Sequence, residues 1–167
     1  MFPKDEIVLI VDTKNNESGS ASRHEMRSRG LPHRAAYILV FNSKGELFVQ
    51  KRTTSKDIYP GHYDIAAGGV VLAGESYDES ASRELEEELG IRNTELTPHF
   101  TFCHEDVSNL VWGRVYSCIH DGEMILQEEE IESGFFMTPD KVIVLSEKEP
   151  FTPDGLHVLK RYLGLKE

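Results

Sequence analysis

Cysteine is scarce in this chain, and long apolar runs are missing from it. The 167 residues include two cysteines, Cys103 and Cys118, which form no CxxC motif. Two distant thiols exclude a disulfide scaffold and favour the reducing cytoplasm, so we expect both to be free and buried. No apolar run approaches the roughly 18 residues that a membrane span needs. The charged N-terminal hexapeptide lacks the basic-then-apolar layout of a signal peptide.

Positive charge is also in short supply. Lysine and arginine number 18 against 29 aspartates and glutamates, which gives a net charge of −11. This balance argues against a nucleic-acid polymer or an anionic membrane as a partner, because both attract proteins with a positive field. A small phosphorylated molecule stays open as a substrate, since a few local cations or a metal ion could hold it.

Length and patterning predict a single domain over residues 1–167 with an α/β fold. A chain of this length can bury a core without disulfides or a structural metal. We expect strands at residues 6–12, 35–41, 46–50, 63–72, 100–104, 110–119 and 135–137, and helices at residues 22–29, 76–89, from 138 onward and 152–163. Because strands and helices occur in mixed order, we expect a mixed β-sheet covered by helices.

The helix expected at residues 76–89 carries an unusual density of carboxylates. At about 100° per residue, Glu84, Glu87 and Glu88 share one face, whereas Glu86 points elsewhere, toward solvent. Three like charges beside an apolar stripe repel one another unless a cation lies between them. Clustered carboxylate oxygens suit Mg²⁺ or Mn²⁺ better than zinc. The alternative is a solvated acidic helix face in an acidic protein.

The residues around these glutamates complete a longer motif. From Gly69 to Ile91 the chain follows G-x5-E-x7-R-E-U-x-E-E-x-G-U, where U is apolar. Its other fixed positions are Glu75, Arg83 and Gly90. At average residue usage such a match arises by chance about once in 10⁸ windows. In this segment the chain resembles the Nudix superfamily.

The resemblance implies a Nudix-type α/β/α sandwich and an enzyme that hydrolyses acid anhydrides in phosphorus-containing substrates. Its cofactor would be Mg²⁺ or Mn²⁺, which supplies positioning and charge neutralisation at a diphosphate. The substrate would be a small organic diphosphate, such as a nucleoside-diphosphate-like compound. The residues expected in catalysis and metal binding are Glu84, Glu87 and Glu88. Glu75 and Arg83 would pair to brace the loop that begins at Gly69.

Looser similarity, over about residues 6–145, links the chain to the isopentenyl-diphosphate isomerase branch of the superfamily. It rests on segments such as His33-Arg34-Ala35, Gln50-Lys51-Arg52, Ser55-Lys56 and Tyr59-Pro60-Gly61. In that branch, the positions matching Arg52 and Lys56 contact the substrate diphosphate. We therefore expect both cations to bind substrate, although an exposed pair of hairpin charges is the alternative.

The residues that an isomerase needs for its chemistry are replaced in this chain. Gly68 stands where the isomerases have their cysteine, and Val70 where they have a histidine ligand. Their Glu-x-Glu strand corresponds to Trp112-Gly113-Arg114. A 1,3-proton shift then has no obvious acid–base pair. Hydrolysis is the preferred prediction, and an isomerase-like enzyme or a non-catalytic diphosphate sensor are the alternatives.

Four other features have two interpretations each. His33 is a packing residue or a substrate contact, and we favour packing. Trp112 fits the core and a nucleobase stack equally well. The acidic run at 128–130 is a solvated turn, which we favour, or a source of an extra acid at the site. Two Cys/His pairs, at 103–104 and at 118 and 120, could in principle form a soft-metal site, but they match no zinc spacing, so we favour free buried thiols. The oligomeric state stays open and allows a homodimer.

Overall fold

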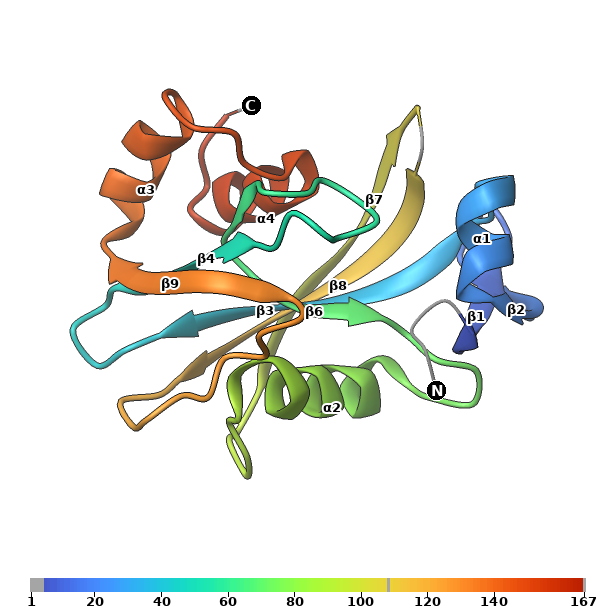
Figure 1. Cartoon of the computed structure of the whole chain (residues 1–167), viewed down its shortest axis with the longest axis horizontal. Coiled ribbons are helices and arrows are strands. Elements are labelled where there is room, and N and C mark those ends of the chain that lie inside the picture. Colours follow the sequence, from blue (N-terminus) through green and yellow to red (C-terminus); the bar gives the residue numbers. More distant parts are fainter. Residues whose placement is uncertain (1–4, 108, 167) are drawn as a thin grey trace.

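The computed structural model describes residues 5–107 and 109–166, so residues 1–4 of the N-terminal hexapeptide lie outside the described part. Nine strands and four helices make up that part (Figure 1). The strands are β1 (Ile7–Val11), β2 (Glu17–Ser22), β3 (His33–Phe41), β4 (Leu47–Arg52), β5 (Tyr63–Asp64), β6 (Ala67–Val70), β7 (Thr97–Asp106), β8 (Asn109–Ile119) and β9 (Ile131–Met137). The helices are α1 (Arg23–Arg29), α2 (Tyr77–Leu89), α3 (Pro139–Ser146) and α4 (Pro153–Tyr162).

Strand β3 is the centre of the sheet, and its sequence is apolar on both faces. Ala36, Ile38 and Val40 pack in one cluster with α2, whereas Tyr37 and Leu39 pack in another with α3 and α4. A strand covered on both faces reads as a continuous apolar run rather than an alternating one. The expected α/β/α sandwich is confirmed, with α2 on one side of the sheet and α3 and α4 on the other (Figure 1).

The sheet divides next to β3. Strand β3 pairs in parallel with β8 and antiparallel with β6, and meets β4 only at Phe41 and Leu47 among the described residues. Strand β4 pairs instead with β5 and β9. The segment expected as one strand at 63–72 therefore contains two, because the chain passes from the β4 half at Asp64 to the β3 half at Ala67. That prediction was wrong in detail, and the division creates the walls of a cavity.

Helix α2 begins and ends as its sequence predicts. The Ser76 hydroxyl accepts a hydrogen bond from the Glu79 backbone N–H, and the Glu79 carboxylate accepts one from the Ser76 N–H. Gly90 ends the helix in the left-handed conformation, with φ 67°. Ala81, Leu85 and Leu89 are fully or almost fully buried, and each leucine contributes about 1.5–3 kcal/mol of burial free energy. This stripe fixes how α2 is rotated and therefore where its glutamates lie.

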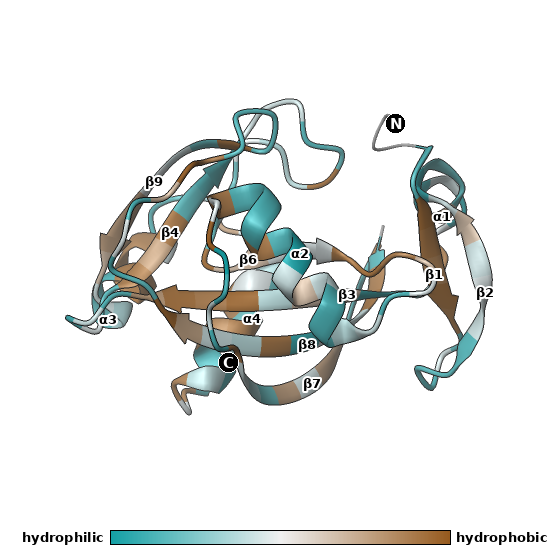
Figure 2. Ribbon diagram, turned by 90° about the horizontal axis from the view of Figure 1, so that it is seen from below, coloured by the Kyte–Doolittle hydropathy of each residue, from teal (hydrophilic) through white to brown (hydrophobic). Residues whose placement is uncertain are grey.

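The N-terminal unit of β1, β2 and α1 lies at one end of the molecule. Strand β1 pairs along its length with β2 and touches β3 at the Ile10–His33 pair. Figure 2 shows β1 as apolar and β2 as mostly polar, which explains why the sequence did not predict β2. Helix α1 is capped by Ser22 and ends at left-handed Gly30, close to the expected helix at 22–29. In the described residues, no helix is long and apolar enough to cross a membrane.

Candidate active site

The glutamates of α2 differ sharply in exposure. Glu88 is 7% exposed, the Glu84 side chain is 14% exposed, and the Glu87 side chain is 48% exposed. Glu86 is on the solvent side, where its carboxylate pairs with Arg92 at 3.0 Å. The Glu86 side chain is 49% exposed, about as much as Glu87, so exposure separates only Glu84 and Glu88 from it. Glu86 differs from Glu87 in its partner, because Glu87 shares Arg83 with Glu84. The burial of Glu84 and Glu88 sets them apart from ordinary surface carboxylates, which stay in water.

Two glycines of β6 receive these buried carboxylates. The Gly68 N–H donates a hydrogen bond of 3.4 Å to Glu88 Oε2. A Cβ atom at Gly69 would lie 2.7 Å from Glu84 Oε1 and 2.8 Å from its Cδ, so glycine is what lets that carboxylate reach the strand. The first glycine of the box therefore has a steric role.

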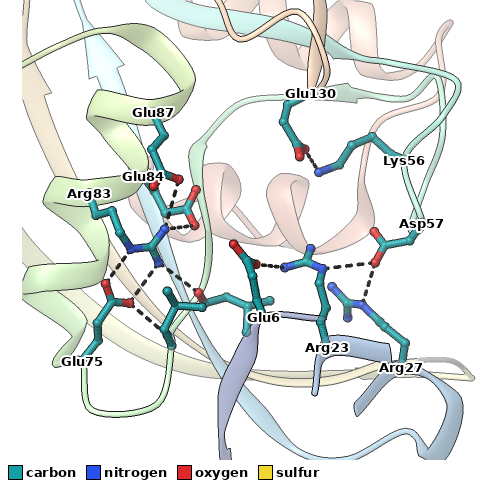
Figure 3. A network of polar contacts seen from close by, with 12 residues as sticks. Glu6, Arg23, Arg27, Lys56, Asp57, Glu75, Arg83, Glu84, Glu87 and Glu130 are labelled. Carbon is teal, nitrogen blue, oxygen red and sulfur yellow. Dashed lines mark hydrogen bonds and ion pairs between the residues drawn. The ribbon is translucent and has the colours of Figure 1, made fainter. Parts of the chain in front are cut away.

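Arg83 holds the glutamate face and the preceding loop together (Figure 3). Its Nε and Nη2 atoms lie 2.5 and 2.9 Å from the two carboxylate oxygens of Glu75. Its Nη1 atom donates to Glu84 at 2.9 Å and to Glu87 at 3.1 Å. Glu75 also accepts the N–H of Leu72 at 2.9 Å. The structure shows the Glu75–Arg83 pair that the resemblance implied, and this pair ties the loop after β6 to α2.

Electrostatics at the glutamates favour a bound cation. Burial, followed by the negative charge of Glu84, raises the pKa of Glu88 to about 8, and burial also raises the pKa of Glu84. In residues 5–107 and 109–166, no three His, Cys, Asp or Glu side chains already converge as a metal-ligand cluster. Arg83 instead bridges Glu84 and Glu87. Two costly buried carboxylates with only oxygen donors fit a hard divalent cation such as Mg²⁺ or Mn²⁺.

A cavity opens beside the two glycines, between the halves of the sheet. It encloses about 90 Å³, which is less than a typical small-molecule site, and it opens to solvent. Four cationic side chains line it, from α1, from β4 and from the loop after β4. These are Arg23, Arg27, Arg52 and Lys56, which we call the cation cluster. The cavity therefore brings positive charge next to the acidic face of α2 in a protein of net charge −11.

Two members of the cation cluster were not predicted from sequence. Arg23 and Arg27 both face Asp57, at 3.5 and 3.2 Å, and Arg23 also lies 3.8 Å from Glu6 (Figure 3). Their place at the cavity depends on how α1 packs, which no local pattern reveals. The sequence offers one hint of this placement, which is that Arg23 and Arg27 are four residues apart on a helix just before β3.

The two predicted diphosphate ligands both reach the cavity but also have partners within the protein. Arg52 donates from Nε and Nη2 to the Ile58 carbonyl oxygen, at 3.1 and 2.8 Å. Lys56 pairs closely with Glu130. Burial, followed by the charge of Arg52, lowers the pKa of Lys56 to about 8. The favoured interpretation of the acidic run as a solvated turn holds for Glu128 and Glu129, which are exposed, and is wrong for Glu130.

Comparison with known proteins agrees with this geometry. The family model of the NUDIX domain matches residues 31–162. The Nudix hydrolase PA4841 of Pseudomonas aeruginosa is 46% identical over 158 residues, covering 95% of this chain and 94% of that protein. The chain belongs to the Nudix family. As a Nudix hydrolase it acts on phosphorus-containing anhydrides, a class of enzyme that generally uses divalent metal cations.

Further relatives and solved structures extend the comparison. The Nudix hydrolase YfcD of Escherichia coli K12 is 42% identical over 158 residues, covering 95% of this chain and 87% of that protein. The crystal structure of DR0079 from Deinococcus radiodurans has a TM-score of 0.82 at 25% identity, covering 93% of this chain and 98% of that one. The NUDIX domain of Shewanella oneidensis NrtR, complexed with ADP ribose, shares the fold alone, with a TM-score of 0.62 at 14% identity over 80% of this chain and 86% of that one.

Two other residues considered as substrate contacts, His33 and Trp112, lie in different parts of this Nudix hydrolase. His33 is 2% exposed on the cavity wall, with Nδ1 2.9 Å from the Leu31 carbonyl oxygen, and burial lowers its pKa to about 4. Trp112 packs against the small cluster of Leu9 and Val11, away from the cavity lining.

The disfavoured alternative, a soft-metal site at the two Cys/His pairs, finds no support in the cysteine positions. Cys118 is buried as expected, whereas Cys103 is exposed, so that half of the prediction was wrong. Cys103 pairs in register with Trp112, six residues along β8 from Cys118. The two thiols therefore lie at different places along the β7–β8 ribbon. Cys103 is exposed because it lies on the opposite face of β7 from its buried neighbour Phe102.

Two positions at which the isomerases carry catalytic residues, Gly68 and Arg114, have structural roles in this protein. Gly68 has φ 136°, and a Cβ atom there would overlap the carbonyl oxygen of Ala36 on the paired strand. A cysteine therefore cannot be placed at this position without moving β3 or β6. Arg114 lies over the ring of Tyr77, 5.7 Å from its centroid.

Proposed function

We propose that this Nudix hydrolase cleaves the diphosphate linkage of a small organic diphosphate, such as a nucleoside-diphosphate-like compound, with Mg²⁺ or Mn²⁺ as cofactor. The observation that carries the proposal is the placement of buried Glu84 and Glu88 against Gly68 and Gly69, at the wall of a cavity lined by four cations. Glutamates behind the two glycines and cations that line the cavity suit a metal-bound anion between them.

In this proposal the glutamates Glu84, Glu87 and Glu88 hold the divalent cation. When bound, the cation neutralises phosphoryl oxygens and lowers the pKa of a water molecule. Arg83 fixes the rotamer of Glu84 through its 2.9 Å contact, while its bidentate pair with Glu75 keeps the loop in place. Gly69 leaves the space that the Glu84 carboxylate needs.

The cation cluster would hold the phosphates from the other side. Lys56 and Arg52 lie on the segment that leads from β4 into the cavity wall, and Arg23 and Arg27 approach from α1. Each has a carboxylate or carbonyl partner now, so a phosphate must compete with Asp57, Glu130 and Ile58 for them. Charge-assisted hydrogen bonds to a phosphate are strong enough to do so.

A structural neighbour and the net charge both support a small molecule as the substrate. The NrtR neighbour carries ADP ribose, a small molecule with a diphosphate, which supports a small-molecule substrate here. The net charge of −11 disfavours a nucleic-acid polymer. The single domain over residues 1–167, the homodimer and the cytoplasmic location remain predictions.

A panel of organic diphosphates, assayed for phosphate and pyrophosphate release with Mg²⁺ and with Mn²⁺, tests the proposal. It should contain nucleoside diphosphates and isopentenyl diphosphate, which release phosphate directly, and nucleotide sugars, whose monophosphate products release phosphate after an added phosphatase acts on them. We expect metal-dependent release from at least one compound and loss of that release in Glu84→Gln, with Glu86→Gln as the control from the solvent side of the same helix. Binding of a panel member without release in any metal would favour a diphosphate sensor instead.

A further inference from the structure

One end of the cavity is acidic rather than basic. Tyr37, Asp64, Thr152 and Asp154 all line it, and we call this group the acid end. Its members come from β3, from β5 and from the start of α4. Arg52 belongs to the cation cluster and also lies 3.7 Å from Asp64, so it joins the two ends. A diphosphate held by the cation cluster would thus place its organic group toward the acid end.

The acid end presents hydrogen-bond acceptors without enough donors. The Tyr37 hydroxyl donates to Asp154 Oδ2 at 2.7 Å, but Oδ1 of Asp154 is buried and has no hydrogen-bond partner among the described residues. Thr152 is 1% exposed, and its hydroxyl faces the Asp64 carboxylate, so it supplies no donor to Asp154 Oδ1. Buried polar atoms in native proteins are almost always paired, so an unpaired buried carboxylate oxygen on a cavity wall indicates a missing donor.

The backbone is arranged to bring these oxygens together. A Cβ atom at Gly155 would lie 2.7 Å from Asp64 Oδ1 and would overlap Thr152 Oγ1, so glycine allows the first turn of α4 to approach β5. Burial, followed by the charge of Asp154, raises the pKa of Asp64 to about 6. Asp64 already has the Ala66 N–H at 3.3 Å and Arg52 at 3.7 Å, so among the described residues it is Oδ1 of Asp154 that leaves room for a further donor.

We propose that the acid end recognises the organic group of the substrate by accepting hydrogen bonds from it, so that the preferred diphosphates carry an amino-substituted nitrogen heterocycle. This inference rests on the proposed function for the placement of the diphosphate. A hydrocarbon group would displace water and leave Asp154 Oδ1 unpaired. An oxo-substituted heterocycle keeps a ring N–H but sets a carbonyl oxygen against the carboxylates.

Matched pairs of nucleoside diphosphates test this, because each pair exchanges an amino group for an oxo group at one position. Adenosine with inosine diphosphate and cytidine with uridine diphosphate make the two pairs. We expect the amino member to have a kcat/KM about ten- to hundredfold higher, as for one hydrogen bond to a charged group. Methylene-bridged analogues, which cannot be hydrolysed at the diphosphate, should show the same preference in their dissociation constants.

Asp154→Asn replaces the acceptor oxygen with an amide of the same shape, and should remove or reverse the preference. Asp140→Asn is the matched control, since Asp140 occupies the same Thr-Pro-Asp position at the start of α3 but is exposed. Equal constants within each pair for the wild-type protein would overturn the inference, whether or not Asp154→Asn folds. Hydrolysis without preference refutes the acid end alone, whereas an amino preference in binding without hydrolysis refutes the proposed function alone.

Discussion

Replacing Gly68 with alanine should cost more stability than any other glycine change near the site. The new methyl group would overlap the Ala36 carbonyl oxygen and lie 2.8 Å from its carbonyl carbon, both of which belong to backbone that cannot rotate away. The φ of 136° adds strain of about 1–3 kcal/mol, and the overlap adds about 1–3 kcal/mol. Gly68→Ala should therefore lower the free energy of unfolding by about 2–6 kcal/mol.

The control for this change is Gly45→Ala, in the β3–β4 hairpin. Gly45 has φ 78° and nothing within 4 Å of its missing Cβ, so alanine there brings backbone strain without a collision. Urea unfolding of both variants separates the two contributions, and Gly68→Ala should lose more stability than Gly45→Ala. Equal losses would refute the close packing of β6 against β3, and with it the argument that no cysteine fits at position 68.

Gly69→Ala should behave differently, because its methyl group meets a side chain instead of backbone. The contacts are with Glu84 Oε1, Cδ and Oε2, at 2.7, 2.8 and 3.0 Å. The flexible carboxylate can swing away, so the loss of stability should be smaller than for Gly68→Ala. The catalytic rate should fall strongly, because Glu84 leaves the position in which Arg83 holds it. A variant with unchanged rate would show that this position of Glu84 is dispensable.

Three further results are expected. Arg52→Ala and Lys56→Ala should each lower kcat/KM on the true substrate about ten- to hundredfold. Lys44→Ala, at an exposed position on the β3–β4 hairpin, should leave kcat/KM unchanged. Unchanged kcat/KM in both Arg52→Ala and Lys56→Ala would place the diphosphate elsewhere. His33 has a pKa of about 4 in the folded protein and about 6.5 when unfolded, so the unfolded state binds more protons as the pH falls. In urea unfolding, the free energy of unfolding should therefore fall by about 2 kcal/mol between pH 7 and pH 5, relative to His33→Asn. Parallel pH curves for the two proteins would contradict this. Finally, the protein should not exchange deuterium from solvent into isopentenyl diphosphate, and exchange at a turnover rate would restore the isomerase hypothesis.

Local signals in the sequence predicted the elements whose ends are chemically marked. The cap at Ser76, the stop at Gly90 and the apolar stripe of α2 all appear in the structure, because each depends on neighbours within one or two helical turns. Strand β2 has no such signal, since its residues are polar and mostly exposed. The break between β5 and β6 depends on which strand each half pairs with, and that is a property of topology.

Among the residues of the site, too, those that share one helix were predictable, and those from distant segments were not. The box placed Glu84, Glu88 and Arg83 correctly relative to one another, because they share one helix and periodicity fixes their directions. Contacts between distant segments were not predictable from periodicity. The arginines of α1 lie 25 and 29 residues before Arg52 in the chain and meet it only at the cavity, and Lys56 meets Glu130 across 74 residues of chain.

Binding of Mn²⁺ to the metal-free protein, followed by electron paramagnetic resonance, tests the glutamate face of α2 most directly, because it needs no knowledge of the substrate. The wild-type protein and Glu86→Gln should bind Mn²⁺ with closely similar affinity, since the Glu86 carboxylate points to solvent and pairs with Arg92. Glu88→Gln should bind at least about tenfold more weakly, because it removes a buried charged oxygen ligand. Equal weakening in Glu86→Gln and Glu88→Gln, or undiminished binding in Glu88→Gln, would contradict the assignment of the metal site.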